Sequence, residues 1–410
     1  MNLPLPSGVP SLPDAIPSLP GAIPSLPGAI LPGEPFAVVR PAYGGGSLAD
    51  VLPGVCAALG VPGSADPLGL TEVLAGVDRV AVLLVDGLGA YQLPSVLTHA
   101  PALGQLARRT ITAGFPSTTP VSLATLATGV PPGAHGILGF TTRLASGETL
   151  NHIRWGDEPD PAVWQPAPTR FETARAAGVR STLVTRRDFR GTGLTEACYR
   201  GADFAGADSG AELASAMLAA LASPGIVYGY HPDLDQRGHS DGVGSAAWIA
   251  AASGVGSLVS RLLSGLPAGA ALLVTADHGQ LNVPLSDRFD IGDISDCSAS
   301  VVGVAGEPRV RYLHVVPGAV GDVVAACRER LGASAMVLTR DEAIDSGLFG
   351  PVAAAHRDRI GDVVIICLGE TVVLARDWEP AAVGQLVAYH GSLTAIEMTV
   401  PLLSFVGPPA

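Results

Sequence analysis

The chain of 410 residues contains no lysine, so every strong cation in it is an arginine or a bound metal ion. Its formal net charge is −13, which makes it a poor candidate for coating nucleic acid through the backbone phosphates. Small anionic substrates remain compatible with this charge if metal ions supply local positive charge. Arginine in place of lysine, together with abundant Ala, Gly and Pro, suggests a GC-rich bacterial genome.

Cysteine is scarce, and no CxxC pair is present among Cys56, Cys198, Cys297, Cys327 and Cys367. This argues against a disulfide framework and a thiolate zinc site, and it fits a reducing compartment. The apolar runs are short and interrupted by Asp, Gly or Pro, so we expect no membrane span. The N-terminus lacks the basic segment and apolar run of a secretory signal. We therefore expect a cytoplasmic protein.

The first 36 residues are rich in proline and contain the repeat SLPDAIP, SLPGAIP, SLPGAIL over residues 11–31. Proline at this density removes backbone donors and blocks helices, so we predict a disordered lead-in. Residues 37–410 are then predicted to form one catalytic domain. Apolar residues make up 48% of the chain, which is enough for a sizeable core.

Continuous apolar runs alternate with helical patterns from residue 79 onwards. Short buried strands are predicted at 79–85, 182–185, 226–230 and 271–275, and helices at 171–177 and 247–263. This alternation predicts an α/β fold with a mainly parallel sheet, in which sites collect beyond the carboxyl ends of the strands. Three of the four strands run directly into Asp or His, which is the pattern of a functional site.

Between residues 281 and 377 the pattern changes to strands at 301–304, 309–316, 335–338 and 363–367, with a helix near 323–331. Two interpretations stay open for this region. It could be an inserted cap that folds over the site, or it could supply edge strands of the same sheet.

The segment FPSTTPVSLATLATGVPPGAHGILGF, residues 115–140, predicts a helix that begins at three consecutive hydroxyl residues and stops at Gly129. Free backbone N–H groups and the helix dipole favour negative charge at this position. A hydroxyl there suits a nucleophile that attacks an anionic ester, although an ordinary N-cap role is the alternative for Ser117, Thr118 or Thr119.

Carboxylates and imidazoles recur at the predicted strand ends. Asp86 follows the first strand, Asp277 and His278 follow the fourth, and Asp235 and His239 share one side of a helical turn. Together with His390 these are the ligand types that zinc and similar divalent ions prefer. Each residue alone could lie in a turn or a solvated loop, but their joint occurrence predicts a site for two ions.

On these motifs the chain resembles the alkaline phosphatase superfamily, specifically the type I phosphodiesterase/nucleotide pyrophosphatase family. The resemblance implies an alkaline-phosphatase-like three-layer sandwich, two zinc ions (manganese being the alternative) and hydrolysis through a covalent threonine ester. It places the nucleophile on Thr119. The implied metal ligands are Asp86, Thr119, Asp235, His239, Asp277, His278 and His390.

One position departs from the family pattern. Family members that cleave nucleotides usually carry an asparagine soon after His-Gly-Ile, where it helps to hold a phosphoryl oxygen. Here that position is Phe140, so Phe140, Thr141 and Arg143 are candidate substrate contacts and the preference for nucleotide diesters stays open. The turn at residues 186–190 offers three arginines that could grip a phosphate, although a solvated basic turn is the favoured interpretation.

We therefore expect a metal-dependent hydrolase of phosphodiester or pyrophosphate bonds in a small substrate such as a nucleotide. A phosphomonoesterase or phosphonate hydrolase is the alternative on the same scaffold. A sulfatase lacks support because the segment Ser117-Thr118-Thr119-Pro120-Val121 lacks the arginine of the Cys/Ser-x-Pro-x-Arg motif. The span from Thr119 to Asp235 is short for a phosphomutase. A catalytically silent, metal-bound binding protein is the alternative outside enzymes. The oligomeric state stays open.

Overall fold

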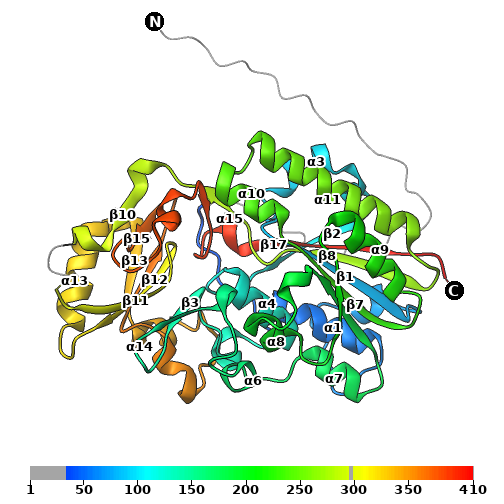
Figure 1. Cartoon of the computed structure of the whole chain (residues 1–410), viewed down its shortest axis with the longest axis horizontal. Coiled ribbons are helices and arrows are strands. Elements are labelled where there is room, and N and C mark those ends of the chain that lie inside the picture. Colours follow the sequence, from blue (N-terminus) through cyan, green and yellow to red (C-terminus); the bar gives the residue numbers. More distant parts are fainter. Residues whose placement is uncertain (1–33, 295–298, 410) are drawn as a thin grey trace, which may run out of the picture.

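The computed structural model describes residues 34–294 and 299–409 (Figure 1), so the proline repeat and Cys297 lie outside the described residues. A seven-stranded sheet has the strand order β2-β17-β8-β1-β7-β5-β6. The strands from β8 to β6 are mutually parallel, and β17 runs antiparallel to β8 and β2. The strands span Arg79–Val85 (β1), Ala107–Thr112 (β2), Ser181–Thr185 (β5), Asp203–Gly206 (β6), Gly225–His231 (β7), Ala270–Thr275 (β8) and Thr399–Val406 (β17).

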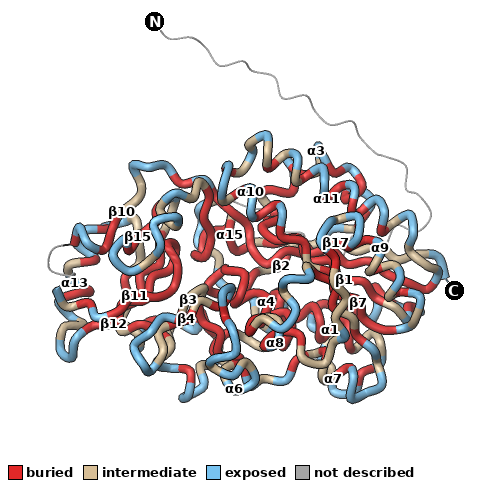
Figure 2. Tube along the Cα trace, in the orientation of Figure 1, coloured by how far each residue is buried: buried red, intermediate tan, exposed pale blue. Residues whose placement is uncertain are grey.

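The middle of this sheet is buried on both faces, as its continuous apolar runs predict. Six of the seven residues of β1 and all six of β8 are buried. Such strands fit only a sheet that helices cover on both sides. Figure 2 shows buried trace in the interior of the molecule, these strands included, and exposed trace along its outer edge. The prediction of a mainly parallel α/β sheet is confirmed.

Helices cover both faces of the sheet and complete three layers (Figure 1). On one face α11 packs against three other helices, with bounds Leu93–His99 (α3), Gly210–Ala220 (α9), Asp233–Asp241 (α10) and Ala246–Gly265 (α11). On the other face α4 packs against its neighbours, with bounds Val51–Ala58 (α1), Thr119–Thr128 (α4), Arg170–Ala176 (α7) and Gly193–Tyr199 (α8). Shorter helices span Leu70–Val73 (α2), Pro132–His135 (α5), Pro161–Trp164 (α6) and Ala395–Met398 (α15).

Helix α11 is the one helix among the described residues that is long and apolar enough to cross a membrane by length and composition. The expectation of no membrane span did not anticipate it. Length and composition alone are weak evidence for a membrane span, because the core helix of a soluble protein has them as well. Here α11 packs against α3, α9 and α10 and buries Trp248 among other residues.

The chain between β8 and β17 forms a second, four-stranded antiparallel sheet in the order β11-β12-β14-β13. Its strands span Val301–Glu307 (β11), Val310–Val315 (β12), Ala335–Thr339 (β13) and Val363–Cys367 (β14), with helices Val320–Leu331 (α13) and Arg340–Asp345 (α14). Two short pairs of strands lie before and after this sheet in the chain. They join Arg288–Asp290 (β10) to Val372–Leu374 (β15) and Leu281–Asn282 (β9) to Ala388–Tyr389 (β16). A hairpin pairs Thr141–Arg143 (β3) with Thr149–Asn151 (β4).

This second sheet has its own core rather than extending the central sheet. Leu313, Val323, Val363 and Ile365 belong to a hydrophobic cluster separate from the main one. In Figure 1 its strands and α13 form the smaller lobe. These four strands therefore form a sheet of their own, and a role of residues 281–377 as a cap stays a prediction.

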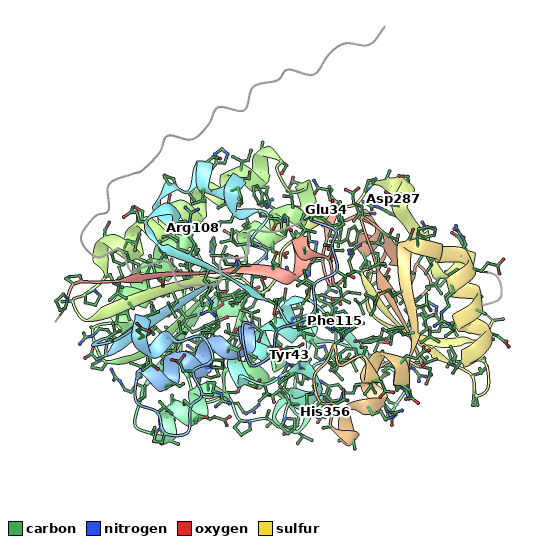
Figure 3. All side chains as sticks on the ribbon, turned by 180° about the vertical axis from the view of Figure 1, so that it is seen from behind. Glu34, Tyr43, Arg108, Phe115, Asp287 and His356 are labelled. Carbon is green, nitrogen blue, oxygen red and sulfur yellow. The ribbon has the colours of Figure 1, made fainter. Side chains whose placement is uncertain are left out.

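Specific polar contacts join the second sheet to the rest of the molecule. Arg309 and Glu397 are both fully buried and form a bidentate pair, with Nε–Oε1 at 2.9 Å and Nη2–Oε2 at 2.6 Å. The Tyr312 hydroxyl donates to the Leu138 carbonyl oxygen at 2.6 Å. His356 Nδ1 lies 2.9 Å from the Gly133 carbonyl oxygen. Figure 3 labels His356 below Tyr43 and Phe115 in that view. The second sheet and the segment before β14 are thus joined to α15 and to the residues that follow α4.

Candidate metal centre and nucleophile

The three central strands β8, β1 and β7 deliver polar residues to the same edge of the sheet. Asp86 directly follows β1, Asp277 and His278 follow β8, and β7 leads into α10, which carries Asp235. The backbone of these strands is parallel and in register, so their carboxyl ends meet. The sequence placed these residues at strand ends, and the fold brings them together.

Asp86, Asp277 and His278 form the first ligand group, in which one ligand atom from each lies within 4.8 Å of the others. His278 Nε2 is 3.5 Å from Asp86 Oδ1 and 3.3 Å from Asp277 Oδ2. The Thr119 hydroxyl oxygen is 3.1 Å from the same His278 nitrogen. Thr119 is the first residue of α4. Its hydroxyl therefore lies both at a helix N-terminus and beside the first ligand group.

Asp235, His278 and His390 form the second group, and His239 lies beside it. His239 Nε2 is 3.3 Å from Asp235 Oδ2 and 3.2 Å from His390 Nε2. His390 stacks on His278 with ring centroids 3.4 Å apart and an interplanar angle of 12°. The two groups are therefore contiguous and share His278.

The charges of these groups fit a divalent cation. Burial, and then the charges of Asp277 and Asp235, raise the pKa of Asp86 well above its ordinary value. Burial likewise raises the pKa of Asp277 to about 6 and lowers the pKa of His278 to about 4. Asp86 Oδ1 and Asp277 Oδ2 are buried atoms without a hydrogen-bond partner among the described residues. Buried carboxylates and neutral imidazoles in this state lack a positive partner, which a metal ion would supply.

Neighbouring groups orient the candidate ligands. The ring Nδ1 atoms of His239 and His390 lie 2.8 Å and 3.0 Å from the carbonyl oxygens of Ala388 and Ser117. Each Nδ1 therefore carries the proton and each Nε2 is left free to face the centre. This is the arrangement of imidazoles that ligate metals through Nε2.

The carboxylates are held in a comparable way. The Tyr230 hydroxyl donates to Asp86 Oδ2, and the Gln280 amide donates to Asp235. Gly87, at φ +73°, lets the turn after β1 approach α10, because a Cβ there would lie 3.1 Å from Asp235 Cα. Sequence reasoning missed Tyr230 and Gln280 as supports, although Gln280 follows Asp277-His278-Gly279 directly and Tyr230 is the second-to-last residue of β7.

The predicted substrate contacts lie against the second sheet. The Thr141 hydroxyl donates to the Gly306 carbonyl oxygen at 2.9 Å, and the Phe140 carbonyl oxygen accepts from His152 N at 3.2 Å. A Cβ at Gly303 would lie 2.5 Å from Arg143 Nε. None of these contacts tests a role in substrate binding, so that role stays a prediction.

Two of the three arginines of the 186–190 turn pair with acidic neighbours. Arg186 pairs with Asp188 at 3.1 Å, and Arg187 pairs with Asp208 and Glu212 on the exposed surface. These pairs agree with the interpretation as a solvated basic turn.

Comparison with known proteins places the chain in a family. A family model described as type I phosphodiesterase / nucleotide pyrophosphatase matches residues 80–393. The chain belongs to this family. The resemblance stated from the motifs is thereby confirmed, and the matched range contains all seven candidate metal ligands. No curated protein sequence matches the chain.

Solved structures of similar fold include an ectonucleotide pyrophosphatase / phosphodiesterase and a phosphonoacetate hydrolase. Inactive murine ectonucleotide pyrophosphatase / phosphodiesterase 5 in complex with AMP is 17% identical, with a TM-score of 0.65, over 80% of this chain and 87% of that chain. Phosphonoacetate hydrolase from Sinorhizobium meliloti 1021 in complex with phosphonoformate is 23% identical, with a TM-score of 0.61, over 82% and 91%. These likenesses confirm the alkaline-phosphatase-like fold.

Proposed function

We propose that this family member is a two-metal hydrolase that cleaves phosphodiester or pyrophosphate bonds in a small substrate through a covalent ester on Thr119. The observation that carries the proposal is the position of the Thr119 hydroxyl. It lies 3.1 Å from Nε2 of His278, the residue that both ligand groups share. It also lies at the N-terminus of a fully buried helix.

Asp86, Asp277, His278 and Thr119 would hold one ion, and Asp235, His239 and His390 the other. Nitrogen and carboxylate donors of this kind fit zinc, with manganese as the alternative. When bound, the two ions supply the positive charge that lowers the pKa of the nucleophile and neutralises phosphoryl oxygens. The lysine-free sequence leaves this charge to metal and arginine.

The chemistry of the chain's own residues follows from their positions. The Thr119 hydroxyl loses its proton to solvent, and its oxygen forms a bond to phosphorus while the bond to the leaving oxygen breaks. The backbone N–H groups and dipole at the start of α4 stabilise the charge that develops on the phosphoryl oxygens. Water then breaks the threonine ester and restores the hydroxyl.

A phosphonate or phosphomonoester substrate is the second candidate. Phe140 supplies no amide side chain, and the Thr141 hydroxyl that follows it is already engaged with Gly306. A phosphonate hydrolase is among the proteins of similar fold. We also propose that the second sheet caps the site, and that the protein works in a reducing compartment such as the cytoplasm, where Cys56, Cys198 and Cys367 remain buried thiols.

The test is hydrolysis of bis-p-nitrophenyl phosphate beside p-nitrophenyl phosphate, with added zinc or manganese. We expect faster cleavage of the diester, loss of activity after chelation, and a fall of about 1,000-fold or more in Thr119→Ala. Thr98→Ala, an exposed threonine on α3, is the matched control and should behave as wild type. A preference for the monoester would favour the second candidate. No turnover of either ester despite bound metal would contradict the hydrolase proposal for simple esters.

A further inference from the structure

A cavity lies beside the paired strands β10 and β15, and none of the seven candidate metal ligands lines it. Its volume is about 490 Å³, which is within the usual range for small-molecule sites. Arg288 at the start of β10 and Leu374 at the end of β15 line it, together with residues of the segment 379–385 that follows β15. Figure 3 labels Asp287, the residue before Arg288, at the upper edge of the molecule.

Part of the lining of this cavity is apolar and is not covered by the protein itself. Leu285 is 80% exposed, so the cavity opens to solvent and a ligand can reach its wall. Leu374, Pro380 and Ala381 belong to the same wall. Single exposed apolar side chains are ordinary on protein surfaces, but several that line one concave site favour a ligand with an apolar body.

Arg288 gives the cavity a positive charge that no acidic side chain neutralises. Its Nη1 atom donates to the Gly384 carbonyl oxygen at 2.8 Å and to the Tyr389 hydroxyl oxygen at 3.2 Å. Its Nη2 atom donates to the Val283 carbonyl oxygen at 2.8 Å. All three acceptors are neutral, and no carboxylate of the described residues pairs with this guanidinium. One N–H group of Nη2 is left for a ligand.

The other charged side chains of the cavity leave it positive. Arg376 also lines it, with a side chain that is 64% exposed and that lies 3.4 Å from Asp290 Oδ2. Glu379 supplies a carboxylate, but both of its oxygens accept hydrogen bonds from Arg311 at 2.6 Å. The lining therefore combines two arginines with one carboxylate that is already neutralised. In a chain of net charge −13, such a place favours an anion.

We propose that this cavity binds a small organic anion, whose charged group lies on Arg288 and Arg376 and whose apolar body lies against Leu285 and Leu374. A guanidinium binds oxyanions such as carboxylate and phosphate through charge-assisted hydrogen bonds. An apolar body of a few rings suits a cavity of this volume. The inference does not rest on the proposed function, because the cavity contains neither the nucleophile nor a candidate metal ligand.

The probe is 1-anilinonaphthalene-8-sulfonate, an organic anion with an apolar body, titrated against the full chain by fluorescence. We expect one probe molecule per chain. Leu285→Glu, which adds a negative charge at the rim, and Ala381→Trp, which fills the cavity, should each raise the Kd about tenfold or more. Arg288→Met removes the cation and should raise it about 10- to 100-fold. Val163→Glu, a comparable change at a residue that is 74% exposed outside the cavity, is the matched control and should bind as wild type.

A second probe tests the requirement for negative charge. N-phenyl-1-naphthylamine has the same rings without the sulfonate group. Wild type should bind it about tenfold or more weakly than the sulfonate, because the charge-assisted hydrogen bond to Arg288 is lost. In Arg288→Met the two probes should bind with similar affinity, since the cation that distinguishes them is gone.

Several results would overturn the site. No binding of the sulfonate by wild type would mean that the cavity holds only water. Wild-type affinity in both Leu285→Glu and Ala381→Trp would mean that the probe binds elsewhere. Equal affinity of wild type for the two probes would mean that the cavity does not select an anion. Leu285 and Ala381 are exposed, so both variants should melt at the Tm of wild type. If Arg288→Met does not fold, these two variants and the neutral probe still decide.

Discussion

Replacing Asp277 by Asn should stabilise the metal-free protein and destabilise the zinc-loaded protein. Asp277 is fully buried, and its Oδ1 accepts hydrogen bonds from Gly87 N and His278 N, both at 3.1 Å. Its Oδ2 makes no hydrogen bond within the described chain and lies 3.3 Å from His278 Nε2. Asparagine keeps the acceptor for both N–H groups and replaces the unpartnered, charged oxygen by a neutral amide.

The magnitude follows from the pKa of Asp277. Burial raises this pKa to about 6, against an ordinary value of about 3.9. Because the folded state has the higher pKa, it binds the proton more tightly, and stability falls as the pH rises from about 4 to about 6. The ionised Asp277 carboxylate therefore lowers the free energy of unfolding by about 3 kcal/mol above about pH 6 and has no effect below about pH 4. For a chain of this length, about 3 kcal/mol corresponds to roughly 4 °C in Tm.

Thermal unfolding with a chelator and with zinc measures both effects. With chelator at pH 8, Asp277→Asn should melt about 4 °C above wild type, and at pH 5 the gap should shrink to about half. With zinc at 1,000 times its Kd, metal binding adds about 4 kcal/mol to the free energy of unfolding of wild type but not to that of the variant. Wild type should then melt above the variant. The reasoning is refuted if the variant melts below wild type in the chelator.

A second buried aspartate provides the control. Asp50 accepts hydrogen bonds from Gly45 N, Gly46 N and both the N and Oγ of Ser47. Its charge is therefore satisfied without metal. Asp50→Asn should destabilise the protein by about 1–3 kcal/mol in chelator and in zinc alike.

Two further variants test how the site is supported. Arg309→Met should cost about 3–5 kcal/mol in urea unfolding, because Glu397 stays buried without its cation, whereas Arg175→Met in an exposed pair should change stability by less than about 0.5 kcal/mol. Equal, small effects would contradict this account of the buried pair. Gly238→Ala would place a Cβ 1.7 Å from Gln280 Oε1, so Gln280 must move and zinc affinity should fall by about tenfold in competition with a chelating dye. An unchanged zinc Kd would argue against a supporting role for Gln280.

The sequence allowed the centre of the fold to be predicted because its strands are continuous apolar runs that end in polar residues. β1 spans Arg79–Val85 as predicted, and α4 begins at Thr119 and ends before Gly129. Asp86, Asp277 and His278 lie within three residues of the ends of buried strands, so the parallel sheet determines that they meet. Their proximity needed no information beyond the strand pattern.

The rest depended on contacts that the local pattern does not contain. β2 and β17 pair at the antiparallel side of the sheet, and their sequences mix apolar residues with Arg108, Arg109 and Pro401, so neither shows a clear strand pattern. Spacing could not show that His278 belongs to both ligand groups. Arg288 and Leu374 line one cavity only because β10 pairs with β15, for which the sequence contains no local signal.

The stereochemistry at phosphorus tests the central proposal most directly. The substrate is one diastereomer of a chiral phosphorothioate diester, hydrolysed by the zinc-loaded protein in water labelled with heavy oxygen. Attack by Thr119 followed by attack of water inverts the phosphorus centre twice, so the account predicts net retention of configuration. Net inversion would contradict it, because water would then attack the substrate directly and Thr119 would not be the nucleophile.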